Sequence, residues 1–275
     1  MDYRHIAFAA GLACTASMIP AIAGEEPRAV LELFTSQGCS SCPAADKLLG
    51  ELAHDPSLLT MSLPVDYWDY LGWKDTLALH GHTTRERAYA DARGDREVYT
   101  PQVVVNGIVH VLGSDKAAIE EAITQTHQNA ALLTLPVTVS VAEGKVQVSV
   151  PAAHGEQRSG EVWLCPITDK VQVSIERGEN EGHTLAYTNV VRRWVKLGDW
   201  NGQAQTFSLP LADLPNRNFT LHDIDRLAAI VQSGVAAKPG LMLGAATASE
   251  RSIARSTRSS SRPRRTINPV CEITL

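Results

Sequence analysis

The chain of 275 residues carries a net charge of −5, and 44% of its residues are hydrophobic. This length allows one large domain or two ordinary ones with a buried core. Five cysteines in so long a chain exclude a small scaffold held together by disulfides, and the acidic body argues against nucleic acid as a partner.

The first residues have the layout of a secretory signal peptide. Charged residues at positions 4 and 5 precede an apolar stretch, residues 6–22, that ends in small residues. Cleavage is expected near Ala23 and Gly24, so that residues 1–23 are removed and the mature protein is secreted or periplasmic. The apolar stretch is too short for a comfortable membrane span and nothing later resembles one, so we expect no integral membrane span.

Residues 24–131 alternate between strand and helix patterns. Apolar runs predict strands at residues 29–34, 58–65, 102–106 and 108–112, and amphipathic patterns predict helices at residues 43–53, 74–93 and 114–128. Asn106 and Gly107, between the last two strands, are a two-residue hairpin signal. This order predicts an α/β domain.

After residue 131 the pattern changes to short strands with alternating apolar residues. Stretches such as "LTLPVTVSVAEGKVQVSV" and "TLAYTNVVRRWVKL", with turn residues between them, are typical of an antiparallel β-sandwich. We therefore expect an all-β sandwich domain at residues 132–248. Residues 249–275 form a Ser/Arg-rich tail with few apolar residues, which should be disordered.

The central motif is Cys39-Ser-Ser-Cys42, which lies between the first strand and the first helix. A thiol attacks only as the thiolate, and a helix N-terminus favours the anion, so this position can lower the pKa of Cys39 from about 8.5 to between about 3.5 and 7.5. Cys39 then suits an exposed nucleophile, and Cys42 suits a more buried resolving thiol. Half a metal site or a structural bridge would have the same spacing, so these alternatives stay open.

A second signal lies further along the chain, where Pro101 opens a strand directly after Thr100. Proline is acceptable at a strand's first residue, and a cis bond there would make a rigid corner. Together with the cysteine pair, this order resembles the thioredoxin superfamily, and "YTPQVVVNG" followed by "VLGSDKAAIEEA" resembles glutaredoxins. The resemblance implies Cys39 as the nucleophile, Cys42 as the resolving cysteine, and Thr100 and Pro101 as the loop that docks the substrate.

The resemblance also points to two further groups of residues. Thioredoxins bury an aspartate beneath the cysteine pair, and the nearest acid here is Glu32 on the preceding strand. Glu32 is either a buried proton acceptor for Cys42 or an acid at a strand edge. Glutaredoxins bind the carboxylate of glutathione at the start of their last helix, where this chain has Gly113, Ser114 and Asp115. The alternative is an ordinary helix cap.

Four stretches taken together resemble a secreted family known as domain-of-unknown-function family 1223. They are "LELFTSQGCSSCPAADKLL", "VDYWDYLGWKD", "YTPQVVVNG" and "RGENEGHTLAYTNVVRRW". The resemblance spans roughly residues 29–246. It implies no settled activity, so the reaction has to be argued from the cysteine pair.

Other residues have more than one interpretation. His80 and His82 could complete a copper or zinc site with the two thiolates, or they could be ordinary polar residues at the start of a helix. The aromatic stretch at residues 65–75 is expected either beside the site or in the core. The polar residues Arg177, Glu179, His183 and Arg192 are expected either in a network at a domain junction or in contact with a ligand. Cys165 alternates with apolar neighbours and is expected to be buried and inert.

These observations predict an exported thiol–disulfide oxidoreductase that reacts through Cys39 and Cys42, without a cofactor or a resident metal. Its expected partners are protein thiols or disulfides, or a small thiol. Two alternatives remain. One is a periplasmic copper- or zinc-handling protein that uses the same cysteines, and the other is a non-catalytic interaction module with a structural bridge.

Overall fold

A computed structural model describes residues 26–153 and 158–249. The predicted signal peptide and almost all of the predicted Ser/Arg-rich tail lie outside the described residues. The described part is mostly β-sheet, and its α-helices are α1 (Cys42–Leu52), α2 (His80–Arg93) and α3 (Lys116–Thr126). None of these helices is long and apolar enough to cross a membrane.

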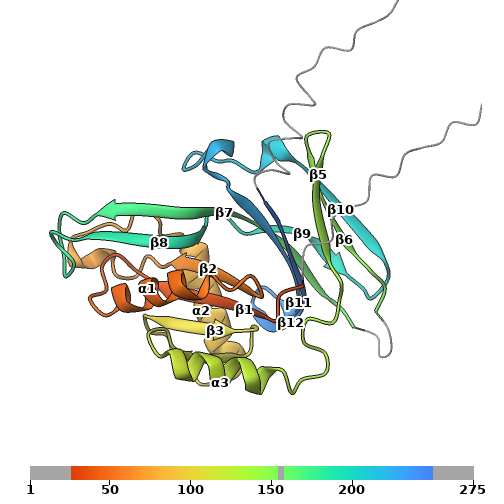
Figure 1. The fold of residues 1–275 in the computed structure, drawn as a ribbon, viewed down its shortest axis with the longest axis horizontal. Coiled ribbons are helices and arrows are strands. Elements are labelled where there is room, and N and C mark those ends of the chain that lie inside the picture. Colours follow the sequence, from red (N-terminus) through yellow and green to blue (C-terminus); the bar gives the residue numbers. More distant parts are fainter. Residues whose placement is uncertain (1–25, 154–157, 250–275) are drawn as a thin grey trace, which may run out of the picture.

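The strands form one large mixed sheet and one small antiparallel sheet (Figure 1). The strands of the large sheet are β1 (Ala29–Thr35), β2 (Leu58–Pro64), β3 (Gln102–Val105), β4 (Val109–Leu112), β7 (Gly160–Ser174), β8 (Thr184–Val191), β9 (Val195–Trp200), β11 (Arg226–Val235) and β12 (Lys238–Ser249). Their order is β12-β11-β7-β8-β2-β1-β3-β4, and β9 pairs with β7. The small sheet has the order β10-β6-β5 and consists of β5 (Thr138–Ala142), β6 (Lys145–Val150) and β10 (Gln205–Pro210).

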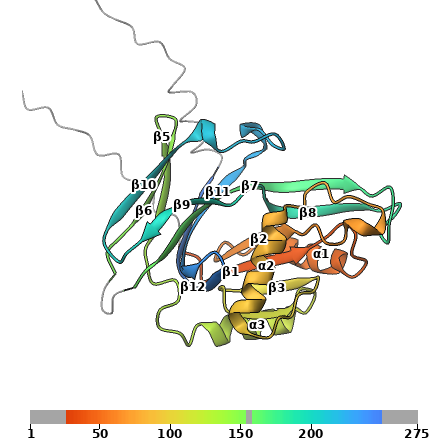
Figure 2. The same cartoon turned by 180° about the vertical axis from the view of Figure 1, so that it is seen from behind.

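Helices cover both faces of β1 and its neighbours, as Figures 1 and 2 show from opposite sides. α1 and α3 pack on Leu31 and Leu33, whereas Tyr89 of α2 packs on Phe34. Successive side chains of a strand point to opposite faces of the sheet, so β1 is buried on both faces and is apolar almost throughout.

β7 links the other large-sheet strands of the second half to β8, and β8 links them to the strands of the first half. Its first part pairs with β9 and β11, and its second part pairs with β8. β8 in turn pairs in parallel with β2, where Val190 is opposite Ser62. Strands from both sides of residue 131 therefore belong to one continuous sheet.

The small sheet packs on the far end of the large sheet. Val148 of β6 and Phe207 of β10 belong to the same hydrophobic cluster as Leu164 of β7 and Leu227 of β11. The strands of this half pair with one another in antiparallel fashion, as the alternating pattern predicts.

One predicted helix begins later than expected. The pattern predicts a helix from residue 74, but α2 begins at His80. The Asp75 carboxylate accepts hydrogen bonds from the backbone N–H groups of Leu77 and Ala78 at 2.8 and 3.0 Å. An aspartate that binds backbone groups just after itself favours a turn over a helix, which explains the late start.

Candidate functional site

The two cysteines lie where β1 passes into α1. β1 ends at Thr35, and Cys42 is the first residue of α1, followed by Pro43 in the first turn. Cys39 and Cys42 form a disulfide with their Cα atoms 5.4 Å apart. Cys39 is 1% exposed and Cys42 is 0% exposed. The expectation of an exposed Cys39 is therefore wrong for this oxidised state, because neighbouring loops cover the pair.

The loop that precedes β3 faces the disulfide. The peptide bond between Thr100 and Pro101 is cis, and Cys39 Sγ lies 3.7 Å from the carbonyl oxygen of Thr100. Trp68 Nε1 donates a hydrogen bond to Thr100 Oγ1 at 2.8 Å. The fold thus brings together Cys39, Thr100 and Pro101, which are far apart in the sequence.

The motif before α3 supports this loop. The backbone N–H of Gly113 donates to the carbonyl oxygen of Pro101 at 2.9 Å. A Cβ atom at Gly113 would lie 2.8 Å from Leu33 Cδ1 and 3.1 Å from Pro101 Cβ, so a larger residue does not fit. Asp115 is the helix cap, because it accepts a hydrogen bond from a backbone N–H of the first turn at 3.0 Å. The predicted start of the helix at Ser114 is therefore corrected to Lys116, and Ser114 is exposed.

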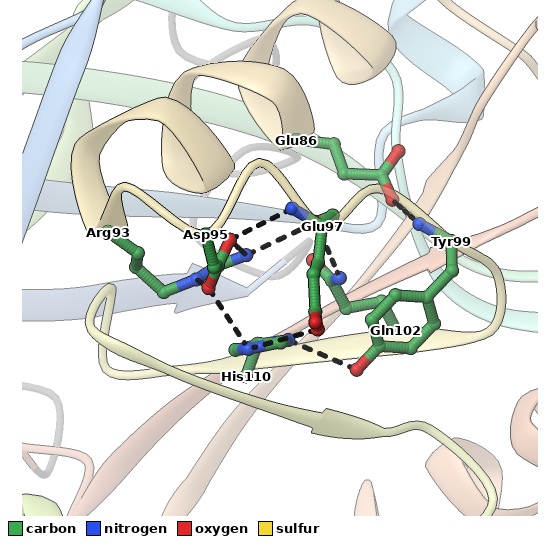
Figure 3. Close-up of polar contacts among 7 residues, drawn as sticks. All are labelled: Glu86, Arg93, Asp95, Glu97, Tyr99, Gln102 and His110. Atoms are coloured by element: carbon green, nitrogen blue, oxygen red, sulfur yellow. Dashed lines mark hydrogen bonds and ion pairs between the residues drawn. The ribbon is translucent and has the colours of Figure 1, made fainter.

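A buried acid holds the backbone next to Thr100 (Figure 3). Glu86 Oε1 accepts hydrogen bonds from the backbone N–H of Tyr99 at 3.2 Å and from the hydroxyl of Tyr67 at 3.3 Å. Glu86 is fully buried, and burial raises the pKa of its carboxyl to about 8. At the other end of Tyr99, the hydroxyl lies 3.1 Å from His110 Nδ1. Tyr99 is thus held at its backbone and at its ring.

His110 is itself held by a charged loop (Figure 3). His110 Nε2 lies 3.3 Å from Asp95 Oδ2, and the same carboxylate oxygen lies 2.8 Å from Arg93 Nε. Burial and the neighbouring Arg93 lower the pKa of His110. These contacts fix the position of the His110 ring, which the Tyr99 hydroxyl contacts.

A second buried acid holds the loop that leads into Cys39. Asp75 Oδ2 accepts a hydrogen bond from the backbone N–H of Gln37 at 2.8 Å, and burial raises the pKa of Asp75 to about 6. The side chain of Gln37 accepts a hydrogen bond from Trp73 Nε1 at 2.8 Å. The aromatic stretch at residues 65–75 therefore lies beside the cysteine loop, which is one of its two expected positions.

The same loop is also held from the second half of the chain. Asn180, between β7 and β8, donates from Nδ2 to the carbonyl oxygens of Gln37 and Cys39 at 2.9 and 3.0 Å. Glu179 Oε2 accepts a hydrogen bond from the backbone N–H of Ser40 at 3.0 Å, and this contact lowers the pKa of Glu179. The sequence analysis did not single out Asn180, because no local pattern links it to a residue 143 positions earlier.

Glu32 does not face the cysteines, which corrects the suggestion that it is a proton acceptor for Cys42. Its carboxylate lies 2.6 Å from Arg85 Nε and accepts a hydrogen bond from Tyr89, and both partners belong to α2. α1 packs on the opposite face of the sheet. Glu32 therefore belongs to a buried ion pair on the other side of β1.

Asp46 is the buried acid on the cysteine side of the sheet. It lies on α1 four residues after Cys42, and residues with this spacing share one face of a helix. Asp46 is 4% exposed, and neither of its carboxylate oxygens has a hydrogen-bond partner among the described residues. Burial raises the pKa of Asp46 well above its ordinary value. The sequence analysis did not single out Asp46, although its helical spacing from Cys42 is a signal that could have identified it.

The two histidines of the metal alternative have different surroundings. His80 is exposed, and its Nδ1 lies 2.9 Å from Asp66 Oδ2. His82 is buried, its Nδ1 lies 2.9 Å from the carbonyl oxygen of Pro64, and burial lowers its pKa to about 4. Within residues 26–153 and 158–249, no three His, Cys, Asp or Glu side chains are grouped so that they could hold a metal ion. Cys165 is a buried free thiol, as predicted.

Comparisons with known proteins identify the family. The sequence model of the family described as "Protein of unknown function (DUF1223)" matches residues 30–232, so the chain belongs to this family, as the sequence motifs predict. None of the curated proteins matches the chain. Among solved structures, the X-ray crystal structure of a structural-genomics target from Agrobacterium tumefaciens is similar, with a TM-score of 0.70 and 30% sequence identity. The similarity covers 81% of this chain and 94% of that chain.

Proposed function

We propose that this member of the DUF1223 family is a thiol–disulfide oxidoreductase whose first half is thioredoxin-like. The observation that carries the proposal is the Cys39–Cys42 disulfide at the start of α1, with the carbonyl oxygen of Thr100 3.7 Å from Cys39 Sγ. A helix N-terminus stabilises the thiolate that attacks or leaves during exchange. A proline loop beside the disulfide supplies backbone groups next to the reacting sulfur.

The reaction begins when the thiolate of a partner attacks Cys39 Sγ. The Cys39–Cys42 bond breaks, Cys42 leaves as a thiolate and takes up a proton, and a mixed disulfide joins Cys39 to the partner. A second thiolate of the partner then attacks the partner's own sulfur in this mixed disulfide, so that Cys39 is released and also takes up a proton. Two electrons pass from the partner to the protein, and the two protons lost by the partner's thiols balance those gained by the cysteines. The reverse sequence oxidises the protein.

Two side chains support these steps. Ser41 Oγ lies 3.3 Å from Cys39 Sγ, so its hydroxyl can donate a hydrogen bond to that sulfur when it carries charge. Asp46 keeps its proton to a higher pH than an ordinary aspartate because it is buried. One helical turn from Cys42, it is placed to give that proton to the leaving thiolate.

The burial of both sulfurs favours a second candidate, a structural disulfide in a non-catalytic interaction module. A disulfide of that kind resists reduction and has a reduction potential below about −300 mV. Equilibration with glutathione redox buffers, followed by alkylation and mass measurement, gives the potential of this pair. A potential above about −300 mV favours exchange, and a lower one favours the structural bridge.

The direct test of the proposal uses Cys42→Ser. Without Cys42 the mixed disulfide at Cys39 cannot be resolved from within the protein, so partners stay attached. We expect adducts that a reducing agent releases, and none with the double variant Cys39→Ser/Cys42→Ser. The variant Cys165→Ser is the matched control, since Cys165 is a buried thiol outside the pair. The absence of adducts, together with a potential below about −300 mV, would leave only the structural bridge.

A further inference from the structure

The loop between β7 and β8, residues 175–183, is a compact unit with its own hydrogen bonds. The backbone N–H of Ile175 donates to the carbonyl oxygen of His183, and that of Gly182 donates to the carbonyl oxygen of Ile175, both at 2.9 Å. Ile175 is 2% exposed, so the base of the loop is anchored in the protein. Figure 1 shows the β7–β8 hairpin running alongside α1, which places this loop at the end of the sheet that carries the cysteines.

The loop occupies the polar backbone groups that flank Cys39. Asn180 binds the carbonyl oxygens of Gln37 and Cys39, and Glu179 binds the N–H of Ser40. An extended polypeptide docks on another chain mainly through such main-chain donors and acceptors. Because these three groups are already paired with the loop, a polypeptide that docks beside Cys39 has to compete with the loop for them.

A second loop, the one that carries Trp68, also packs against the cysteine loop. Trp68 binds Thr100 through its indole N–H, and a Cβ atom at Gly38 would lie 3.0 Å from Trp68 Cβ. The tryptophan therefore packs directly against the residue before Cys39. This close packing gives a physical reason for glycine at position 38.

We propose that the 175–183 loop is a cover that sets the size of the partner. In the closed state Cys39 is almost fully buried, so a low-molecular-weight thiol reaches it through a small local opening, whereas a protein thiol reacts only when Glu179 and Asn180 release the cysteine loop. This inference rests on the proposed function, because it concerns the partner of that reaction.

The charge of Glu179 gives the cover a second effect. Its carboxylate accepts a hydrogen bond from the N–H of Ser40, the residue next to Cys39, and so places a negative charge beside the cysteine loop. A nearby like charge disfavours formation of a thiolate. Release of the loop therefore exposes Cys39 and also makes it a better thiolate.

The experiment compares how fast two dithiols reduce the disulfide of the purified protein. Dithiothreitol is the small probe and reduced thioredoxin is the protein probe, and free cysteines are counted by alkylation and mass measurement. The variants are Asn180→Ala, which removes two hydrogen bonds to the cysteine loop, and Glu179→Gln, which removes the charge and replaces a charge-assisted hydrogen bond to Ser40 by a weaker neutral one. Glu181→Gln, an exposed residue of the same loop, is the matched control. Circular dichroism at each step shows that the variants are folded.

We expect the wild-type protein and Glu181→Gln to react readily with dithiothreitol and slowly with thioredoxin. Two hydrogen bonds together shift a local opening equilibrium by roughly tenfold or more, so Asn180→Ala should accelerate reduction by thioredoxin by about that factor. The rate of reduction by dithiothreitol should increase much less. If Asn180→Ala does not fold, Glu179→Gln alone should give a smaller rise in the same direction, with a lower pKa of Cys39 in iodoacetamide labelling of the reduced protein.

Two outcomes would overturn the inference. One is a wild-type protein that thioredoxin reduces as readily as dithiothreitol does, and the other is a pair of variants with unchanged rates for both probes. Neither outcome bears on the proposed function, since both probes report access to the disulfide. Conversely, the absence of adducts with Cys42→Ser together with the low reduction potential of a structural bridge would exclude the oxidoreductase, while the two reduction rates would still measure the cover.

Discussion

Replacing Glu86 by glutamine is expected to stabilise the protein above pH 7 and to have a smaller effect at pH 5. Burial raises the pKa of Glu86 from 4.5 to about 8. In the unfolded chain the carboxyl loses its proton near its ordinary pKa, whereas the folded protein keeps the proton until about pH 8. Between these values the unfolded state binds fewer protons than the folded state, so the free energy of unfolding falls as the pH rises.

The magnitude follows from the same two pKa values. A difference of one pKa unit corresponds to about 1.4 kcal/mol, so the buried carboxyl costs about 3 kcal/mol at pH 7 and about 4 kcal/mol at pH 8. Glutamine keeps an oxygen that can accept the hydrogen bonds from Tyr99 and Tyr67. The substitution therefore removes the charge and retains the contacts. Arg87 and Arg93 lower the pKa of Glu86 but do not outweigh its burial.

Urea unfolding at pH 5, 7 and 8, followed by tryptophan fluorescence, measures this effect. The difference in the free energy of unfolding between Glu86→Gln and wild type should grow from about 1 kcal/mol at pH 5 to about 3 kcal/mol at pH 7. Glu97→Gln, which changes an exposed acid of the neighbouring loop, is the control and should show no such growth. A difference that stays the same at all three pH values would refute the reasoning, because it would show that Glu86 does not titrate in this range.

Two further substitutions test buried ionisable side chains other than Glu86. Arg85→Ala should lower the free energy of unfolding by about 3–5 kcal/mol, because it leaves the buried carboxylate of Glu32 unpaired. Urea unfolding measures this loss, and a loss no larger than that of the exposed Arg87→Ala would contradict it. Asp46→Asn should slow reduction of the disulfide at pH 7 by about tenfold, because the leaving thiolate loses its proton donor. Timed alkylation measures the rate of reduction. Glu51→Gln, on the exposed face of α1, is the control, and equal rates for the two variants would contradict the role of Asp46 as proton donor.

Features of the fold that depend only on residues close together in the sequence can be predicted from the sequence. Asn106 and Gly107 have φ angles of 53° and 80°, the left-handed conformation of a tight turn, and β3 and β4 pair in antiparallel fashion around them. Val105 lies opposite Val109, so residues 106–108 connect the strands and the predicted two-residue loop is one residue too short. The strand that leads to Cys39 and the helix that starts at Cys42 also lie where the pattern predicts them. In each case the signal and the structure lie within a few residues of each other.

The start of α2 shows where such local arguments fail. Residues 74–79, with the sequence KDTLAL, have a composition that is compatible with a helix, and the sequence predicts one. In the structure Asp75 binds the backbone of Gln37, which lies 38 residues earlier, as well as its own neighbours. A tertiary contact of this kind overrides helix propensity, which is only a weak preference.

Accessibility of the cysteines is the property that the local motif could least reveal. A pair of cysteines at a helix start predicts an exposed nucleophile, because nothing within the motif covers it. The cover comes from Asn180 and Glu179, and these reach Cys39 only because β8 pairs with β2. A parallel pairing between strands so far apart in the sequence leaves no signal in the local pattern of either strand. The reactivity of the pair can therefore be argued from the motif, but the choice of partner depends on the second half of the chain.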